Sequence, residues 1–303
     1  MPTARAIVLT LMAMGAFACN SLLCRLALKH TSIDAATFTA VRIVTGALVL
    51  WIVVRAQRGA QTGSGTWLSA LALFVYAAGF SFAYVSLPAS TGALLLFGAV
   101  QATMIGRGIW MGERLRKPQL VGLVLAIGGL FGLFLPGVSA PPLFGSILML
   151  SAGAAWGIYS LRGRSAGDPT RVTAGNFLRA VPIAVGLSLL MRESSSFDVA
   201  GLSYAVASGA VASGIGYAIW YTALPALKAT SAATVQLSVP VITAVGGMIF
   251  MDEALTLRFG LASLAILGGI ALVIVERRGA QTVRSEDAHP VSADPNKRET
   301  KTP

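Results

Sequence analysis

Aromatic and hydroxyl side chains recur at helical spacing in the first half of the sequence. Tyr76, Phe80 and Tyr84 are spaced four residues apart within an apolar run, which places them on one face of a helix. Such a face can bury the apolar part of a small molecule against its rings and bond a polar head through its hydroxyls. The alternative is that the rings face lipid. That alternative suits Phe80 better than Tyr76, because an unpaired hydroxyl in lipid is costly.

The second half of the sequence carries a matching stripe. At an offset of 137 residues the stripe corresponds to Ser213, Tyr217 and Tyr221, with Trp220 beside them. Two facing stripes of this kind would form an amphipathic cavity wall, with Tyr76 and Tyr217 near its middle.

Polar groups in other apolar runs extend the candidate site. Asn20 and Tyr159 correspond at an offset of 139, and so do Phe17 and Trp156. Two amide side chains within apolar runs either join helix to helix or contact the substrate, and both interpretations stay open. The predicted substrate-binding set is Phe17, Asn20, Tyr76, Phe80, Tyr84, Gln101, Trp156, Tyr159, Ser213, Tyr217, Trp220, Tyr221 and Gln236.

A second set of residues is predicted to be gating or structural. Arg42 and Arg179 correspond at an offset of 137 and lie near the starts of two expected helices. An arginine within a membrane faces the protein interior or reaches water, so each either attracts a substrate carboxylate or pairs with groups at a helix end. The pattern favours the structural or gating role. The remaining members are Glu113 and Glu253 at helix ends and Pro240 as a hinge, and close helix packing is expected at Gly128, Gly129, Gly132, Gly268 and Gly269.

The composition predicts that membrane helices position these residues. Hydrophobic residues make up 55% of the chain, charged residues 12%, and the mean hydropathy is +0.74, whereas about a quarter of the residues of a soluble domain are charged. A barrel is excluded because its strands are shorter and alternate. About 20 apolar residues cross the hydrocarbon layer as a helix, so we predict an all-α membrane protein with spans at 6–28, 36–54, 67–87, 91–111, 119–135, 143–161, 173–191, 202–224, 231–251 and 257–275.

The basic residues predict the orientation of the chain. With the amino terminus in the cytoplasm, the outer loops hold only Lys29, Arg192 and Arg258, and the other loop and tail Lys and Arg residues lie inside. This is the positive-inside bias. We therefore expect both termini to be cytoplasmic in a cell (inner) membrane. The net charge of +11 then reflects topology and an anionic inner leaflet, not a nucleic-acid partner.

The two halves of the chain repeat each other. The segment WMGERL at 110–115 returns as FMDEAL at 250–255, and Glu113 and Glu253 are 140 residues apart. We predict two five-helix units, 5–139 and 140–278, followed by a disordered cytoplasmic tail at 279–303. Because five is odd, the second unit is inserted upside down. Inverted repeats of this kind are typical of transporters, whose substrate lies near the midplane between the repeats.

These features resemble a known family. The five-plus-five layout, the Leu-Pro pairs at 87–88 and 224–225, and the two M-x-E-x-L segments are similar to the drug/metabolite transporter superfamily, and within it to EamA-type exporters. Over residues 5–278 the chain looks most like the aromatic amino-acid exporter branch. The resemblance implies a central cavity lined by both halves and alternating access. It implies export of amino acids with broad specificity, and the alternative is export of hydrophobic cations, drugs or other small metabolites.

Other activities are disfavoured by the same sequence. Cys19 and Cys24 point about 140° apart around one helix, and two thiols alone do not define a metal site. His30 and His289 fall in a loop and in the tail, where they cannot serve an intramembrane hydrolase. A channel or a scaffold remains a different class of alternative. We expect no enzyme activity, cofactor or metal, and a monomer whose partners are the lipid bilayer and a small-molecule substrate.

Overall fold

The computed structural model describes residues 3–57, 64–112, 115–135, 140–163, 168–227 and 229–287. Every regular element in these ranges is a helix. Ten helical stretches are long and apolar enough to cross a membrane. The prediction of an all-helical protein with ten spans is therefore confirmed.

The first half consists of five long helices. Asp34 caps the second of them, because its carboxylate accepts the backbone N–H groups of Ala36 and Thr37. Thr66 caps the third in the same way by accepting the N–H of Ser69. Such caps satisfy donors that the first turn leaves free. The helices are α1 (Thr3–His30), α2 (Ala35–Ala56), α3 (Trp67–Tyr84), α4 (Ala89–Trp110) and α5 (Lys117–Phe134).

The second half has the same number of spans, but two of them are interrupted. The complete spans are α6 (Leu143–Gly163), α7 (Pro169–Leu190) and α12 (Leu257–Asp287), and the short 3₁₀ turn η1 (Arg192–Ser194) follows α7. The eighth span joins α8 (Val199–Val206), η2 (Ala207–Ile215), α9 (Gly216–Ala223) and η3 (Leu224–Ala226). The ninth span combines α10 (Ala229–Gln236) with α11 (Ser238–Met251).

The two interruptions differ in kind. The nine residues of η2, ASGAVASGI, form a π-helix with mostly small side chains. Such segments are rare in proteins, and those that occur are often found at functional sites. The ninth span breaks at Leu237, and Pro240 occupies the first turn of α11, where its missing N–H costs no helical bond. The irregular backbone therefore precedes Pro240, and a hinge role for this residue stays a prediction.

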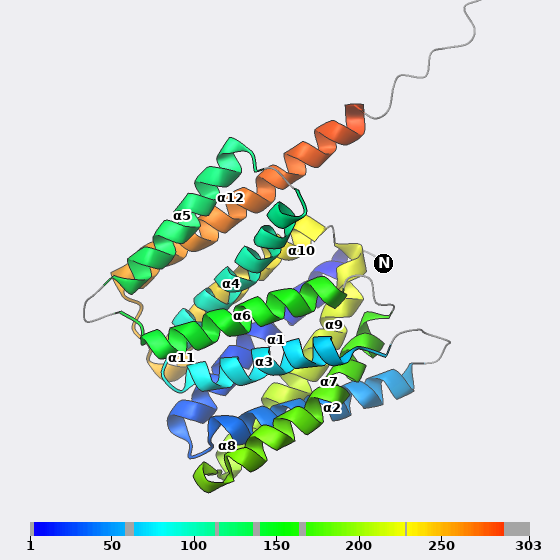
Figure 1. Ribbon diagram of the computed structural model, residues 1–303, viewed down its shortest axis with the longest axis vertical. Helices are drawn as coiled ribbons and strands as arrows, with labels where there is room; N and C mark the ends of the chain where they lie inside the picture. Colours follow the sequence, from blue (N-terminus) through cyan, green and yellow to red (C-terminus); the bar gives the residue numbers. More distant parts are fainter. Residues whose placement is uncertain are drawn as a thin grey trace, which may run out of the picture.

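The helices are arranged with the two halves interleaved. Figure 1 shows α5 and α12 side by side along one edge, and α2, α7 and α8 at the opposite edge. Between these edges, α3 and α6 of different halves pack together, as do α4 and α6. The middle of the molecule is thus a seam between first-half and second-half helices.

Close packing of α5 on α12 depends on particular glycines. A Cβ on Gly122 would lie 2.5 Å from the carbonyl oxygen of Gly269, and a Cβ on Gly129 would lie 2.7 Å from the Cβ of Ala265. The expected packing role thus fits Gly129 and Gly269. It is wrong for Gly128, Gly132 and Gly268, where a Cβ would have no neighbour within 4 Å. Gly128 and Gly132 instead border an open groove between α5 and α12, where Leu257 and Leu261 form part of the opposite wall.

The last helix extends past the predicted start of the tail. We expected disorder from residue 279, whereas α12 continues as a helix to Asp287. Residues 288–303 lie outside the described part of the chain, and disorder there stays a prediction.

A polar contact joins the two halves at one end of the bundle. The N–H of Asp34 donates to the carbonyl of Ser196 at 2.9 Å, and the N–H of Ser196 donates back to the Asp34 carboxylate at 3.0 Å. Partial burial raises the pKa of Asp34, but hydrogen bonds from Thr37, Ser196 and Ala36 outweigh it, so this pKa lies below its ordinary value. The ionised carboxylate therefore stabilises the folded protein.

Substituting Gly122 by Leu should separate α5 from α12. Overpacking of this kind costs about 1–3 kcal/mol, so the melting temperature of the purified protein in detergent should fall. Gly128→Leu is the matched control, because it adds the same side chain to the same helix in open space. Equal melting temperatures for the two variants would contradict this account of the packing.

The Asp34 contact should make stability depend on pH. The folded-state pKa is lowered from 3.8, so the advantage of wild type over Asp34→Asn should be fully present above that pH. As the pH falls through the lowered folded-state pKa, the carboxylate protonates and the advantage should disappear. Melting temperatures of both proteins, measured from neutral pH downward, test this. A difference that persists unchanged at the lowest pH would show that ionisation of Asp34 is irrelevant.

Candidate functional site

A small cavity lies in the seam between the two halves. Its volume is about 20 Å³, which is room for roughly one water molecule. The side chains around it leave no room for a larger molecule. Six of the predicted substrate-binding residues line this cavity: Phe17, Asn20, Tyr76, Phe80, Trp156 and Tyr217.

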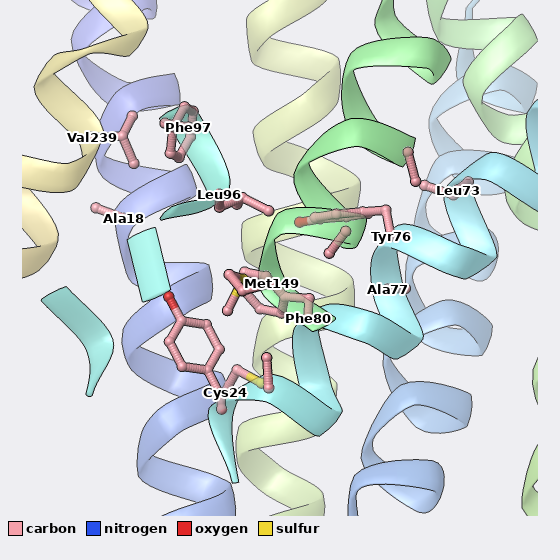
Figure 2. Close-up of a cluster of buried hydrophobic side chains, with 14 of the residues drawn as sticks. Ala18, Cys24, Leu73, Tyr76, Ala77, Phe80, Leu96, Phe97, Met149 and Val239 are labelled. Atoms are coloured by element: carbon pink, nitrogen blue, oxygen red, sulfur yellow. The ribbon is translucent and has the colours of Figure 1, made fainter. Parts of the chain in front are cut away.

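Aromatic rings from both halves form the cavity wall. The ring of Trp156 lies 4.8 Å from that of Tyr76, 5.3 Å from that of Tyr159 and 5.2 Å from that of Tyr217, between centroids. Phe17 contacts Tyr217 edge to face at 5.8 Å. Figure 2 shows Tyr76 and Phe80 projecting from α3 into the core near Leu96 and Met149. Because α6 supplies Trp156 and α9 supplies Tyr217, the wall joins the second half to α1 and α3 of the first.

A buried guanidinium lies against this wall. Arg42, on α2, is 2% exposed. Its Nη2 donates to the hydroxyl of Tyr76 at 2.8 Å, and its Nε donates to Oγ of Ser213 at 3.3 Å. The guanidinium carbon is 5.1 Å from the ring centroid of Tyr76 and 4.9 Å from that of Phe80, within the range of cation–π attraction. Arg42 therefore bridges the first-half stripe and the second-half stripe at Tyr76 and Ser213.

Asn20 completes the polar network beside the cavity. Its Nδ2 donates to the Tyr76 hydroxyl at 3.3 Å, and its Oδ1 accepts from Oγ of Ser208 at 2.7 Å. Ser208 belongs to the π-helical segment η2. The network thus joins α1, α3 and the eighth span through polar side chains. These side chains would lack hydrogen-bond partners if they faced lipid.

The other predicted binding residues lie outside the cavity lining. Trp220 borders it through an edge contact with Phe17 at 5.9 Å, whereas the hydroxyl of Tyr84 donates to the carbonyl of Ala89 at 3.2 Å, near one end of the bundle. The structure does not bring the remaining members into the lining. Tyr159, Ser213 and Gln101 are buried, and Tyr221 and Gln236 are half-buried.

Arg179 has surroundings unlike those of Arg42, although their positions correspond in the repeat. Arg179 lies well inside α7, not at its start, and it donates to the carbonyl of Gly175 at 2.9 Å and to that of Ser64. One turn away, Asn176 accepts the N–H of Thr66 at 2.8 Å. Both contacts attach α7 of the second half to the segment that precedes α3. Arg179 is thus a helix-to-loop contact at one end of the seam.

Glu253 makes the corresponding connection at the opposite end. Its carboxylate accepts the N–H of Ala89 at 2.9 Å and lies 3.6 Å from Nε of Arg25, and both side chains are largely buried. Arg25 also donates to the carbonyl of Tyr84 at 2.8 Å. A carboxylate at the amino terminus of a helix accepts hydrogen bonds from the free backbone N–H groups there and interacts favourably with the helix dipole. Glu113, its repeat counterpart, lies outside the described residues.

Sequence reasoning missed several residues at the site. Arg25 was recognisable, because the repeat aligns it with Arg164 and an arginine in a span needs a partner. Ser208 carried no signal, because the π-helix that turns it toward Asn20 was not foreseen. The other unpredicted lining residues, Ser21, Leu96, Phe97 and Ala212, are small or apolar and lack any distinguishing pattern.

Comparison with known proteins agrees with this architecture. The family model of the EamA-like transporter family matches residues 4–135 and matches again over residues 143–275. The chain belongs to the EamA-like transporter family. It is a multi-pass membrane transporter with a duplicated domain, and it is not an enzyme. The exact limits of the two predicted repeats and the cytoplasmic location of the termini stay predictions.

Individual relatives of this EamA-like transporter include proteins with and without a stated activity. An uncharacterised protein of Pseudomonas aeruginosa is 55% identical over 92% of this chain and 98% of its own length. The threonine/homoserine exporter RhtA of Escherichia coli K12 is 31% identical over 56% of this chain and 58% of its own length. A solved crystal structure, 18% identical, has a TM-score of 0.63 and covers 89% of this chain and 99% of that one. At that identity it supports the fold alone.

Neutralising Glu253 should weaken closure at its end of the seam. We expect Glu253→Gln to raise severalfold the rate at which a membrane-impermeant maleimide labels a cysteine placed at Ser21, which lines the cavity and is buried. The measurement uses cells in which Cys19 and Cys24 have been replaced. Asp252→Asn is the matched control, because it neutralises the adjacent, exposed carboxylate. Unchanged labelling in Glu253→Gln would argue against closure by this residue.

Proposed function

We propose that this EamA-like transporter exports amino acids, including aromatic and neutral ones, by alternating access. The observation that carries the proposal is the cluster of rings and hydrogen-bonding groups in the seam between its halves. The edges and faces of the Trp156, Tyr76 and Tyr217 rings suit apolar side chains. Arg42 and Asn20 supply polar groups for a charged head. The predicted binding residues that line the cavity are the substrate site of this proposal.

Transport requires the seam to open. A cavity of about 20 Å³ is too small for an amino acid, so the halves must separate on one side to admit the substrate. Cross-half contacts occur at both ends: Glu253 with Ala89 and Arg25 at one end, and Asn176 and Arg179 with the segment before α3 at the other. In the proposed cycle, one set breaks while the other holds, which is the gating role we assign to these residues.

The named relatives and the charge of the site both favour amino acids. RhtA exports threonine and homoserine according to its name, and its similarity covers part of this chain. Export of hydrophobic cations is the alternative, since aromatic rings also attract cations. The guanidinium of Arg42 already occupies the faces of Tyr76 and Phe80 and would repel a second cation. We further propose that the protein acts as a monomer in the cell membrane with both termini in the cytoplasm.

Counterflow into liposomes that contain only the purified protein tests the proposal. Liposomes are preloaded with unlabelled phenylalanine, threonine, methionine, lysine or glutamate, and uptake of the labelled amino acid is followed. We expect saturable exchange of several of them. Trp156→Ala should lower exchange of phenylalanine by roughly tenfold, because aromatic pairs and burial together contribute more than 1.4 kcal/mol.

Trp110→Ala is the control for that substitution. It removes the same side chain from a position that is 83% exposed on the outer surface of the bundle, so exchange should stay at the wild-type level. Exchange of a lipophilic cation but of no amino acid would transfer the function to the alternative. Flux that rises linearly with concentration, without counterflow, would indicate a channel.

A further inference from the structure

The charge of Arg42 has no counter-ion among the described residues. Its side chain is 2% exposed, and no Asp or Glu oxygen of the described chain lies within 4 Å of its nitrogens, in contrast to Arg25 with Glu253. Its two assigned hydrogen bonds go to neutral hydroxyls. Taking an ion out of water is costly unless an opposite charge compensates it. The position thus carries an uncompensated positive charge beside the cavity.

One arm of this guanidinium is also unoccupied. Nη1 of Arg42 is buried and has no hydrogen-bond partner in the described part of the structure. A buried donor without a partner costs free energy, and a guanidinium presents its N–H groups in a fork that fits the two oxygens of a carboxylate. The fork lies against Tyr76 and Phe80, both of which line the cavity.

The repeat supplies an internal comparison for this arginine. Arg179 holds the corresponding position in the second half, but its guanidinium is bonded to backbone carbonyls of Gly175 and Ser64. A purely structural arginine of this fold is thus satisfied by backbone oxygens. Arg42 is not, and its partners are side chains that line or border the cavity.

From these observations we propose that Arg42 is the receptor for the carboxylate of the substrate, so that the site selects carboxylates. This inference rests on the proposed function and narrows its substrate class. When the seam opens, Nη1 and Nη2 bind the carboxylate oxygens, and the Tyr76 hydroxyl yields or shares its bond. The lining residues include no Asp or Glu, so the substrate's ammonium meets no carboxylate there, and only neutral groups such as the rings, the Asn20 amide and the Ser21 hydroxyl surround it. The carboxylate is therefore the essential group, and the ammonium is dispensable.

Competition against phenylalanine counterflow separates these two groups. The competitors are L-phenylalanine, L-phenylalaninamide, which lacks the carboxylate, 3-phenylpropionate, which lacks the ammonium, and phenethylamine, which keeps only the ammonium. With wild-type protein we expect 3-phenylpropionate to compete about as well as phenylalanine. The amide and the amine should compete roughly tenfold more weakly or worse, as for the loss of a charge-assisted hydrogen bond.

Variants locate this selectivity at Arg42. Arg42→Gln should abolish the difference between acid and amide, and Arg42→Lys should restore part of it, because lysine keeps the charge without the fork. Arg179→Gln is the matched control and should leave the acid–amide ratio unchanged. Ligand-induced shifts in the melting temperature provide a second readout. If Arg42→Gln does not fold, the four competitors with the wild-type protein still decide whether the site selects carboxylates, and Arg42→Lys tests whether Arg42 is responsible.

Several outcomes would overturn the inference or the proposed function separately. Equal competition by phenylalanine and its amide with wild-type protein overturns the carboxylate receptor and leaves amino-acid export standing. Counterflow of labelled 3-phenylpropionate without counterflow of any amino acid overturns amino-acid export and supports the receptor. A selectivity for acids that survives in Arg42→Gln but disappears in Arg179→Gln overturns the assignment to Arg42.

Discussion

Every polar group within the membrane has to find its partner inside the protein, and this constraint organises the whole molecule. Lipid offers no hydrogen bonds, so hydroxyls, amides and charges collect where helices face one another. Here they collect in the seam between the halves, where Asn20 and Arg42 both donate to the Tyr76 hydroxyl. The same two side chains also bond serines of the eighth span. The polar side chains that cannot face lipid therefore lie in the same seam in which a substrate would need polar groups.

The duplicated halves use this seam unequally. Arg42 and Arg179 hold corresponding positions, yet Arg42 faces the aromatic wall, whereas Arg179 donates to the backbone carbonyls of Gly175 and Ser64. The difference follows from their neighbours. Small residues of η2 let α2 approach the eighth span closely, so that Gly209 packs against the backbone of Arg42. Beside α7, in contrast, lies Ser64 of the segment that precedes α3, and Arg179 donates to its carbonyl. The repeat therefore accounts for the shared architecture of the two halves. Differences between neighbouring residues place the guanidinium of the first half, but not that of the second, at the aromatic wall.

Periodicity and hydropathy predicted the spans because each depends on residues close in sequence. The seam was accessible for a different reason: the duplication lets distant positions be compared, and the repeat offsets identified Phe17, Asn20, Tyr76, Trp156 and Tyr217, which line one cavity. The π-helix was not foreseen, because ASGAVASGI has no signature that separates it from an α-helix. Nor were the orientations of Gln101 and Tyr84, since a span's polar residue reveals its burial but not which neighbour it faces.

Contacts at both ends of the seam have a consequence for the balance between states. Glu253 accepts a backbone N–H group of α4 and forms an ion pair with the Arg25 guanidinium, but the same groups bond water once that end opens. The net cost of exchanging such a bond for water is only about 0.5–1.5 kcal/mol. Open and closed arrangements can then differ by a few kcal/mol, the range in which a bound substrate shifts the population. The substrate is thus the group that compensates the central charge of Arg42, whereas water replaces the contacts at either end of the seam when that end opens.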